Sequence, residues 1–356
     1  MAESAATNAH RIRRAAGNVV LCLGALMAAC LVIHRIAPLP DIPEVSAKLA
    51  YFDRHRDEFD TVFVGSSRVY RGIMPGIFDA AAPTKSFNLG IDGMMAPESY
   101  FLLEKILAKK PARLKWIFVE LTSLQSQIDM GRSSTMRDVY WHDWPRTVAM
   151  CRNIFITRAG RVGLRKKGRL AIFQKNCELA SLHLQLFLKN CANVGRGVEL
   201  FCGTPGVSPD ALEAVFGPPL SGFAQMAGRR VSLSGADLER YEKMRASAAT
   251  AKTRQDGRNA AFQQATARAV ARVRSAGAVP LFVITPWPDV PRVFFPDKKS
   301  APVVFSFNDP AGFPELFRAD RHVDAGHLNR RGAEEFTRLL AARFTQFLIA
   351  PNPSSN

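Results

Sequence analysis

Short, β-branched segments that alternate with helical stretches constrain the fold of this chain most strongly. Five segments are predicted to be strands, over residues 60–65, 85–90, 114–120, 280–285 and 303–307. The second, which has no β-branched residue, is the weakest of them. Helices are predicted where apolar side chains recur at helical spacing, over residues 46–58, 98–108 and 331–347. Strands that alternate with helices form a parallel sheet covered on both faces. The expected fold is therefore α/β, a three-layer sandwich with a parallel sheet.

The interval between the third and fourth predicted strands is too long for a single crossover connection. Residues 125–255 are rich in arginine, glycine and isolated aromatic side chains. We interpret them as a mostly helical insertion that caps the ligand-binding edge of the sheet, because no change in composition marks a second domain. The expected organisation is one domain over residues 51–350, followed by a tail over 351–356.

The N-terminus has the pattern of a membrane anchor. Arg11, Arg13 and Arg14 precede an uncharged, largely apolar run over residues 15–33, which is close to the roughly 20 residues that span a bilayer. Because a basic flank stays in the cytoplasm, residues 1–14 are expected to be a cytoplasmic tail. The rest of the chain would then lie outside the cytoplasm.

Proline-rich residues 34–50 are expected to form the linker that leaves the membrane. A cleaved signal peptide, with small residues over 25–29, and a lipoprotein site at Cys30 are alternatives to an uncleaved anchor. The apolar run continues through Ile33 without a polar break, which favours the uncleaved anchor. We therefore expect a single-pass protein of a bacterial inner membrane, with its domain in the periplasm.

The formal net charge of +17 raises the question of a nucleic-acid partner. An exported chain with no zinc-finger spacing and no aromatic RNA-binding motif argues against one. The densest basic stretch contains Arg158, Arg161, Arg165, Lys166, Lys167 and Arg169. A membrane surface or an anionic polysaccharide is a better-motivated partner for it, and a solvated helix face is the alternative.

Four of the six cysteines lie in the middle of the chain, at Cys151, Cys177, Cys191 and Cys202. They form either two disulfides in an oxidising compartment or buried free thiols. No Cys-x-x-Cys pair is present, so a metal site is not expected, and nothing in the sequence indicates an organic cofactor.

Two distant motifs carry the residue types of serine-dependent acyl chemistry. Ser67 follows the first predicted strand, and Asp324 precedes His327 by three residues near the C-terminus. An aspartate at that spacing can orient the imidazole, which then takes a proton from a serine. Ser67 is the candidate nucleophile, His327 the base and Asp324 the orienting carboxylate. His322 lies nearby without that spacing.

Simpler roles remain for the same residues. Ser66 or Ser67 would cap a helix that begins there. Asn329 would cap the closing helix, with His327 beside it by chance. Both motifs nevertheless fall where catalytic residues are expected, because Ser67 and Thr285 follow strand ends and ligands bind at the carboxyl ends of parallel strands.

Four further residues are candidates to contact the substrate. Gly93 is expected to donate its N–H to an oxyanion together with the N–H of Ser67, and a tight turn is the alternative. Arg68 would hold an anionic group or the acyl oxygen, unless it pairs with a nearby carboxylate. Trp287 would stack on a sugar ring, unless it is a core or lid contact. Asn88 lies in the same glycine-containing loop as Gly93.

In order and position these blocks resemble the SGNH (GDSL-like) hydrolase superfamily over residues 60–125 and 278–348. The most specific match is the block Asp-x-x-His-Leu-Asn-x-x-Gly-Ala, which begins at Asp324. The resemblance implies a flavodoxin-like sheet. It also implies that Ser67 is the nucleophile, that Gly93 is an oxyanion donor, and that Asp324 and His327 complete the site.

Two positions depart from the family pattern. Ser66 stands where the family usually has Asp, and residues 119–123, Val-Glu-Leu-Thr-Ser, stand where it has Gly-x-Asn. The third oxyanion donor is therefore missing or is supplied by another residue.

Gly-Ser-Ser-Arg after a membrane anchor resembles the exported acyltransferases of this superfamily, such as the alginate O-acetyltransferase accessory proteins and the D-alanyl transfer proteins. That resemblance implies acyl transfer, with acetyl as the expected group, from an acyl donor to a cell-envelope or secreted glycan. It also implies a multi-span membrane acyltransferase as a partner. A carbohydrate esterase that uses water, and a non-catalytic polysaccharide-binding scaffold, remain as alternatives.

Overall fold

The computed structural model describes residues 2–36, 42–124, 136–157, 168–193, 208–225, 232–255, 259–295 and 301–350. Its centre is a five-stranded sheet in the order β2–β1–β3–β5–β7. The strands are β1 (Thr61–Val64), β2 (Ser86–Asn88), β3 (Trp116–Glu120), β5 (Val279–Ile284) and β7 (Val303–Ser306). All neighbouring strands run parallel, which confirms the predicted α/β class with a parallel sheet.

The strands begin in register, so their carboxyl ends lie close together. Thr61 at the start of β1 pairs with Ser86 of β2 on one side and with Trp116 of β3 on the other. Trp116 in turn pairs with Val279 at the start of β5. The residues that follow these strands therefore meet at one edge of the sheet.

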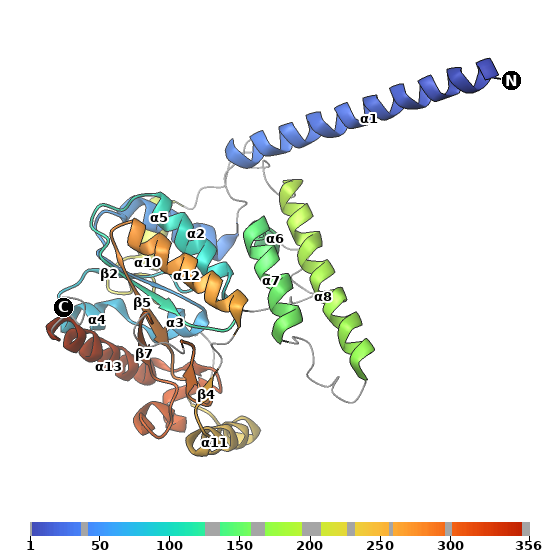
Figure 1. The fold of residues 1–356 in the computed structure, drawn as a ribbon. Helices are drawn as coiled ribbons and strands as arrows, with labels where there is room; N and C mark the ends of the chain where they lie inside the picture. The colour runs from blue at the N-terminus through green and yellow to red at the C-terminus, as the bar shows by residue number, and fades with distance from the viewer. Residues whose placement is uncertain are drawn as a thin grey trace.

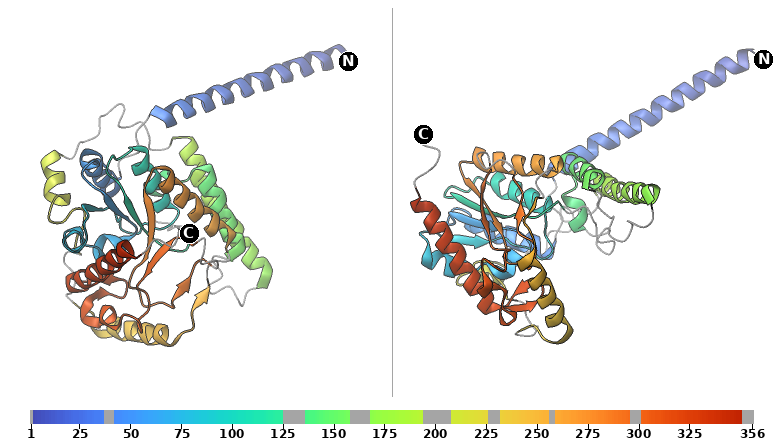
Figure 2. Two further views of the ribbon diagram at one scale, coloured as in Figure 1. Left: turned by 60° about the vertical axis from the view of Figure 1, so that its left-hand side comes forward. Right: turned by 60° about the horizontal axis from the view of Figure 1, so that its bottom comes forward.

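Helices cover both faces of the sheet (Figures 1 and 2). One layer is formed by α2 (Pro43–His55), α5 (Glu98–Ala108) and α12 (Ala260–Ser275). The opposite layer is formed by α3 (Ser67–Gly72), α4 (Pro75–Ala81) and α13 (Arg330–Ile349). Successive residues of β1 point to opposite faces, so that Val62 and Val64 enter the first core and Phe63 enters the second.

The second core is centred on Phe118 of β3, which is fully buried. Its ring lies 4.9 Å from the ring of Phe63, 5.3 Å from that of Phe344 and 5.6 Å from that of Phe78, measured between centroids. These contacts join the central strands to α4 and α13.

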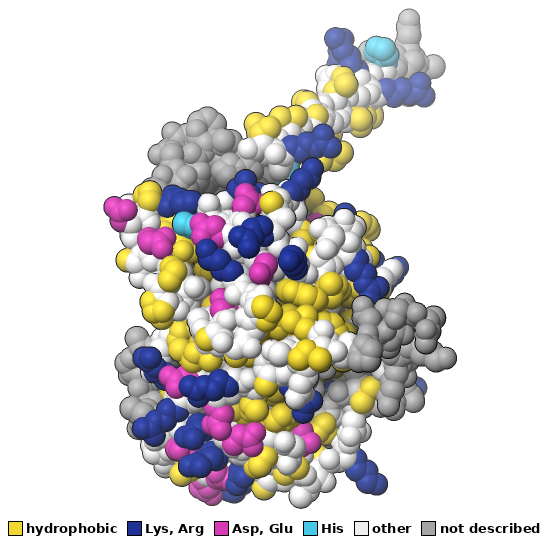
Figure 3. Space-filling model, turned by 90° about the vertical axis from the view of Figure 1, so that its left-hand side faces the viewer, with side chains coloured by type: hydrophobic (Ala, Val, Ile, Leu, Met, Phe, Trp, Pro, Cys, Tyr) yellow, Lys and Arg dark blue, Asp and Glu magenta, His cyan; other side chains and the backbone are white. Residues whose placement is uncertain are grey.

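Helix α1 (Ala2–Ile36) projects from the domain (Figure 1). Its segment His10–Ile36 contains an 18-residue window with a mean hydropathy of 2.3 and is long and apolar enough to cross a membrane. Figure 3 shows it as a rod of apolar side chains with basic side chains near both ends. On the face of the domain in that view, basic and acidic side chains intermingle instead of forming a surface of one sign.

Both ends of the predicted linker over residues 34–50 lie in helices. Helix α1 continues to Ile36, and α2 already begins at Pro43. Proline is favoured in the first turn of a helix because its fixed φ suits the helix and its missing N–H has no partner there. Val45 then packs into the core, so the second half of the expected linker belongs to the domain.

The described parts of the predicted insertion are mostly helical. They contain α6 (Met136–Tyr140), α7 (Trp144–Thr157), α8 (Gly168–Cys191), α10 (Pro209–Phe216) and α11 (Gly235–Thr250). A short strand β4 (Arg254–Gln255) pairs with β6 (Arg292–Val293). Helix α7 packs against α12 and α8 packs against α7, whereas α11 contacts the short helix η2 (Ala319–Arg321). The helices that were expected to form one cap therefore lie in two separate places. Of the helices named here, α11 is the one that contacts the segment before the C-terminal motif.

Two further expectations concern this region. Cys151, Cys177 and Cys191 are free thiols, and Cys177 and Cys191 are exposed, not buried. Cys202 lies outside the described residues, as does the basic stretch except for Arg169, which is exposed at the start of α8.

Replacing Phe118 with alanine should lower the free energy of unfolding by about 3–5 kcal/mol, because a large cavity would open between the rings of Phe63, Phe78 and Phe344. The matched control is Phe155→Ala in α7, where the side chain is 44% exposed. That change should cost no more than about 0.5 kcal/mol. Denaturant unfolding of the detergent-solubilised protein measures both, and equal losses would contradict the proposed core.

Candidate functional site

The turn after β1 places Ser67 at the first position of α3. Ser66 is the N-cap, and its side-chain oxygen accepts a hydrogen bond from the N–H of Arg68 at 3.2 Å. Gly65 is required before it, because a Cβ there would lie 2.4 Å from a methyl carbon of Val69 and 2.7 Å from the Cβ of Glu120. Capping is thus performed by Ser66, which leaves the hydroxyl of Ser67 for another contact.

The hydroxyl of Ser67 meets His327, which is 260 residues further along the chain. The distance from Ser67 Oγ to His327 Nε2 is 2.7 Å. On the other side of the ring, His327 Nδ1 lies 2.9 Å from Oδ1 and 3.0 Å from Oδ2 of Asp324. The three residues predicted from the sequence therefore form one continuous hydrogen-bonded line, which we call the Ser67–His327–Asp324 triad.

The geometry of the triad fixes the roles of the two ring nitrogens. A carboxylate can only accept, so Nδ1 of His327 carries the proton that faces Asp324. Nε2 is then the free acceptor and receives the O–H of Ser67. Asp324 is itself oriented by the N–H of Gly326, which donates to Oδ1 at 2.8 Å. The arrangement can withdraw a proton from Ser67 while the imidazolium is stabilised by the carboxylate.

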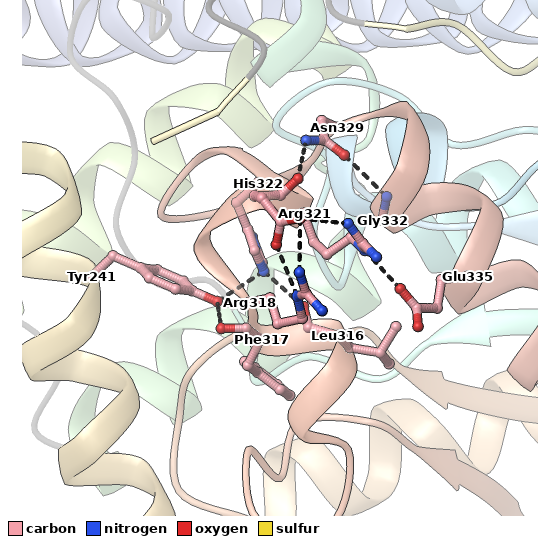
Figure 4. A network of polar contacts seen from close by, with 10 residues as sticks. Tyr241, Leu316, Phe317, Arg318, Arg321, His322, Asn329, Gly332 and Glu335 are labelled. Atoms are coloured by element: carbon pink, nitrogen blue, oxygen red, sulfur yellow. Dashed lines mark hydrogen bonds and ion pairs between the residues drawn. The ribbon is translucent and has the colours of Figure 1, made fainter. Parts of the chain in front are cut away.

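Asp324 and His327 belong to a small antiparallel hairpin, β8 (His322–Asp324) and β9 (His327–Leu328). Figure 4 shows how polar contacts hold it. Asn329 Oδ1 accepts the N–H of Gly332 and so caps α13, while its Nδ2 donates to the carbonyl of Asp320 at 2.7 Å. The expected cap at Asn329 therefore exists alongside the triad and fixes the position of β9.

His322 anchors the other strand of this hairpin from within the core. Its Nε2 lies 2.8 Å from the carbonyl oxygen of Leu316 and 2.8 Å from the hydroxyl of Tyr241 on α11. The Tyr241 hydroxyl donates to the carbonyl of Phe317 at 3.1 Å. Burial lowers the pKa of His322 to about 4, so this ring is neutral and donates to Leu316 through Nε2.

A buried carboxylate lies beneath the turn that carries Ser67. Glu120 ends β3 and is 2% exposed. Its Oε2 accepts the N–H of Ser66 at 2.7 Å, and its Oε1 accepts from the Thr285 hydroxyl at 3.2 Å and pairs with Nε of Arg68 at 3.0 Å. Arg68 thus forms the carboxylate pair that was its alternative role.

Sequence reasoning located Glu120 only as a departure from a family pattern. The available signal was a charged residue at the end of an otherwise apolar strand, at the edge where ligands bind.

Trp287 borders the triad from the loop after β5. The guanidinium carbon of Arg68 lies 5.2 Å from the centre of its ring. A Cβ at Gly326 would lie 2.5 Å from the Trp287 ring, so the indole packs against the backbone between Asp324 and His327. A groove of about 600 Å³ lies between α11 and residues 288–290, which directly follow Trp287 in the chain.

The loop after β2 runs beside the Ser67 turn, because the N–H of Ile91 donates to the carbonyl of Gly65 at 2.9 Å. Asn88 lies beneath this loop and is fully buried. Its amide nitrogen donates to two backbone carbonyls of the α3 segment, and its side-chain oxygen accepts the N–H of Gly90. These contacts make Asn88 a structural residue that shapes the loop, and not the substrate contact that we expected. Gly93 lies further along at an exposed turn, with a φ of +69°.

Lys48 of α2 is fully buried. The sequence does not predict its burial, because the residues around it follow an ordinary helical pattern. Its Nζ donates to the carbonyls of Asn88 at 3.2 Å and Gly90 at 2.5 Å. The same atom lies 3.3 Å from the centre of the Tyr70 ring. Burial lowers the pKa of Lys48 well below its ordinary value. Lys48 therefore ties the loop after β2 to α2.

No protein-family model matches this chain, and no curated protein or solved structure matches it either. The site is therefore interpreted from its own geometry. Within the described ranges, no group of three or more His, Cys, Asp or Glu side chains could hold a metal ion.

The low pKa of His322 predicts that the protein loses stability in mild acid. Between pH about 6.5 and 4 the unfolded state binds a proton that the buried ring does not, so the free energy of unfolding falls as pH falls. Replacement by glutamine keeps an N–H donor for Leu316 and removes this titration. The variant should therefore lose less unfolding free energy on acidification, by about 3 kcal/mol at pH 4. Unfolding measured across this range tests it, and an unchanged slope in the variant would exclude His322 as the cause.

Proposed function

We propose that this protein is a membrane-anchored, extracytoplasmic serine O-acyltransferase of the SGNH type that acts on a glycan. The observation that carries the proposal is the 2.7 Å contact between Ser67 Oγ and His327 Nε2, with Asp324 on the opposite ring nitrogen. Three groups of the types needed for nucleophilic acyl chemistry converge there from opposite ends of the chain.

In the proposed first half-reaction, Ser67 Oγ attacks the carbonyl carbon of the acyl donor while its proton passes to His327 Nε2. The C–O bond to Ser67 forms and the bond to the leaving group breaks, and His327 returns the proton to the leaving group. In the second half, a glycan hydroxyl gives its proton to His327 and attacks the acyl-serine. The ester on the glycan forms and Ser67 regains its proton. Asp324 remains ionised throughout and holds the ring.

The oxyanion of each tetrahedral intermediate requires backbone donors. The N–H of Ser67 and the N–H of Gly93 are assigned this role, and each such donor is typically worth roughly 10²–10³ in rate. The support is indirect: the loop that carries Gly93 is bonded to Gly65 and tied down by Lys48.

Two features favour a transferase over an esterase. Trp287 borders the triad with Arg68 beside it, and an aromatic ring in that position suits a sugar as the acceptor. Helix α1 would keep the domain next to a membrane, where an acyl group could be delivered by a multi-span membrane acyltransferase. The proposed location is the inner membrane, with the domain in the periplasm. An esterase that uses the same residues with water is the second candidate.

Replacing Ser67 with alanine should lower turnover of a chromogenic acetyl ester by at least about 10³, because no nucleophile remains. Asp324→Asn should lower it by roughly 10⁴, because the imidazole is then held in the wrong tautomer. The assay is run with and without a polysaccharide acceptor. Acetate on the glycan supports a transferase, and serine-dependent release without acceptor supports an esterase. Turnover that is unchanged in Ser67→Ala, or absent in all proteins, would refute the enzymatic proposal.

Trp287→Ala should raise the KM for a glycan acceptor roughly three- to tenfold, because a stacking contact is lost. Turnover of the small acetyl ester should change much less. Trp287→Phe is the matched control and should retain most of the acceptor affinity. Equal losses with both substrates would mean that Trp287 only supports the hairpin that carries His327.

A further inference from the structure

Helix α8 carries an apolar stripe on the side that faces away from the protein. The stripe consists of large exposed apolar side chains and two exposed thiols at helical spacing: Leu170, Phe173, Cys177, Leu184, Leu188 and Cys191. Between Cys177 and Leu184 it is interrupted by Ser181. Trp144 and Phe155 of α7 extend this surface, because they contact Phe187 and Phe173.

The inward face of α8 is unusually polar. It buries Asn176, His183 and Asn190 together with two leucines. His183 Nδ1 lies 2.9 Å from Nε2 of the buried His142, and Asn190 Nδ2 donates to the carbonyl of His142 at 3.1 Å. A rotation of α8 that buried the stripe would break these bonds inside the protein, where unpaired polar groups are costly. The apolar stripe is therefore fixed outward.

The position of α8 relative to α1 indicates what covers the stripe. Asn193, just beyond α8, donates from Nδ2 to the carbonyl of Cys30 at 2.8 Å. Cys30 lies within the apolar run, about 9 Å before the end of α1 at a rise of about 1.5 Å per residue. The C-terminal end of α8 thus lies at the level where the membrane-spanning segment ends. Figures 1 and 2 show α1 leaving beside this end of α8 and projecting on the side that α8 covers.

The charges of α8 agree with a lipid surface. Its basic side chains are Arg169, Lys175 and Lys189, against a single acidic residue, Glu178. A helix with one apolar face and a net positive charge is attracted to anionic headgroups while its apolar side chains enter the acyl boundary.

We propose that the outward face of the α7–α8 hairpin lies on the bilayer surface, with α8 in the plane of the interface. This inference rests on α1 spanning that membrane and is independent of the acyl chemistry. The hairpin would fix the orientation of the domain above the bilayer, which the single helix α1 cannot do alone.

The native thiol of Cys177 allows a direct test with the full-length chain. The other five cysteines are replaced by alanine, Cys177 carries an environment-sensitive fluorophore, and the protein is placed in nanodiscs of phosphatidylethanolamine and phosphatidylglycerol. Quenching by nitroxide lipids labelled near the headgroup should be strong, and quenching by aqueous iodide should be several-fold weaker than for a probe at Arg338→Cys. Arg338 is an exposed residue of α13, far from α1 (Figure 1).

A second variant, Leu184→Ser with Leu188→Ser, changes only exposed side chains and should unfold at the same temperature in detergent. It should lose much of the nitroxide quenching at Cys177. Carbonate extraction shows separately whether α1 is inserted. If α1 is inserted and the Cys177 probe is as accessible to iodide as the Arg338→Cys probe, the proposal is wrong. Shielding that appears only in native membranes would also overturn it, in favour of a membrane-protein partner.

Discussion

The carboxylate of Glu120 joins the three strand ends on which the site is built. It receives the N–H of Ser66 after β1, it ends β3, and it accepts the hydroxyl of Thr285 after β5. Arg68 supplies the opposite charge at 3.0 Å. An ionised carboxylate removed from water is tolerated only when it is paired and hydrogen-bonded in this way. The position of Ser67 at the start of α3 therefore depends on a charge pair that lies directly below it.

Most of the sheet could be predicted from the sequence because its strands are short and, except for β2, largely apolar. Each of the five predicted strands is present, and α5 covers residues 98–108 as expected. The triad could also be predicted, because an Asp three residues before a His places both on one small hairpin. What the sequence could not show was that Ser67 and His327 come within hydrogen-bonding distance, since that depends on how α3 and β9 pack.

The residues that support the site were harder to predict, since their partners are distant in sequence. Lys48 is an ordinary helical lysine until α2 packs against the loop after β2, where its Nζ finds two carbonyls. Asn88 is expected from the sequence to contact the substrate, yet tertiary packing buries it completely.

The contacts of Glu120 also limit which groups could stabilise an oxyanion in the proposed reaction. The N–H of Ser66 is committed to Oε2 of Glu120, and the N–H of Arg68 is committed to the side chain of Ser66. The remaining backbone candidates are Ser67 itself and the loop that carries Gly93. The guanidinium of Arg68 meets Glu120 through Nε and has further N–H groups. A fixed cation beside the nucleophile would favour the negatively charged intermediate over the neutral ester. In the proposed reaction Arg68 would supply the third oxyanion donor, which the SGNH pattern that this sequence resembles takes from an asparagine.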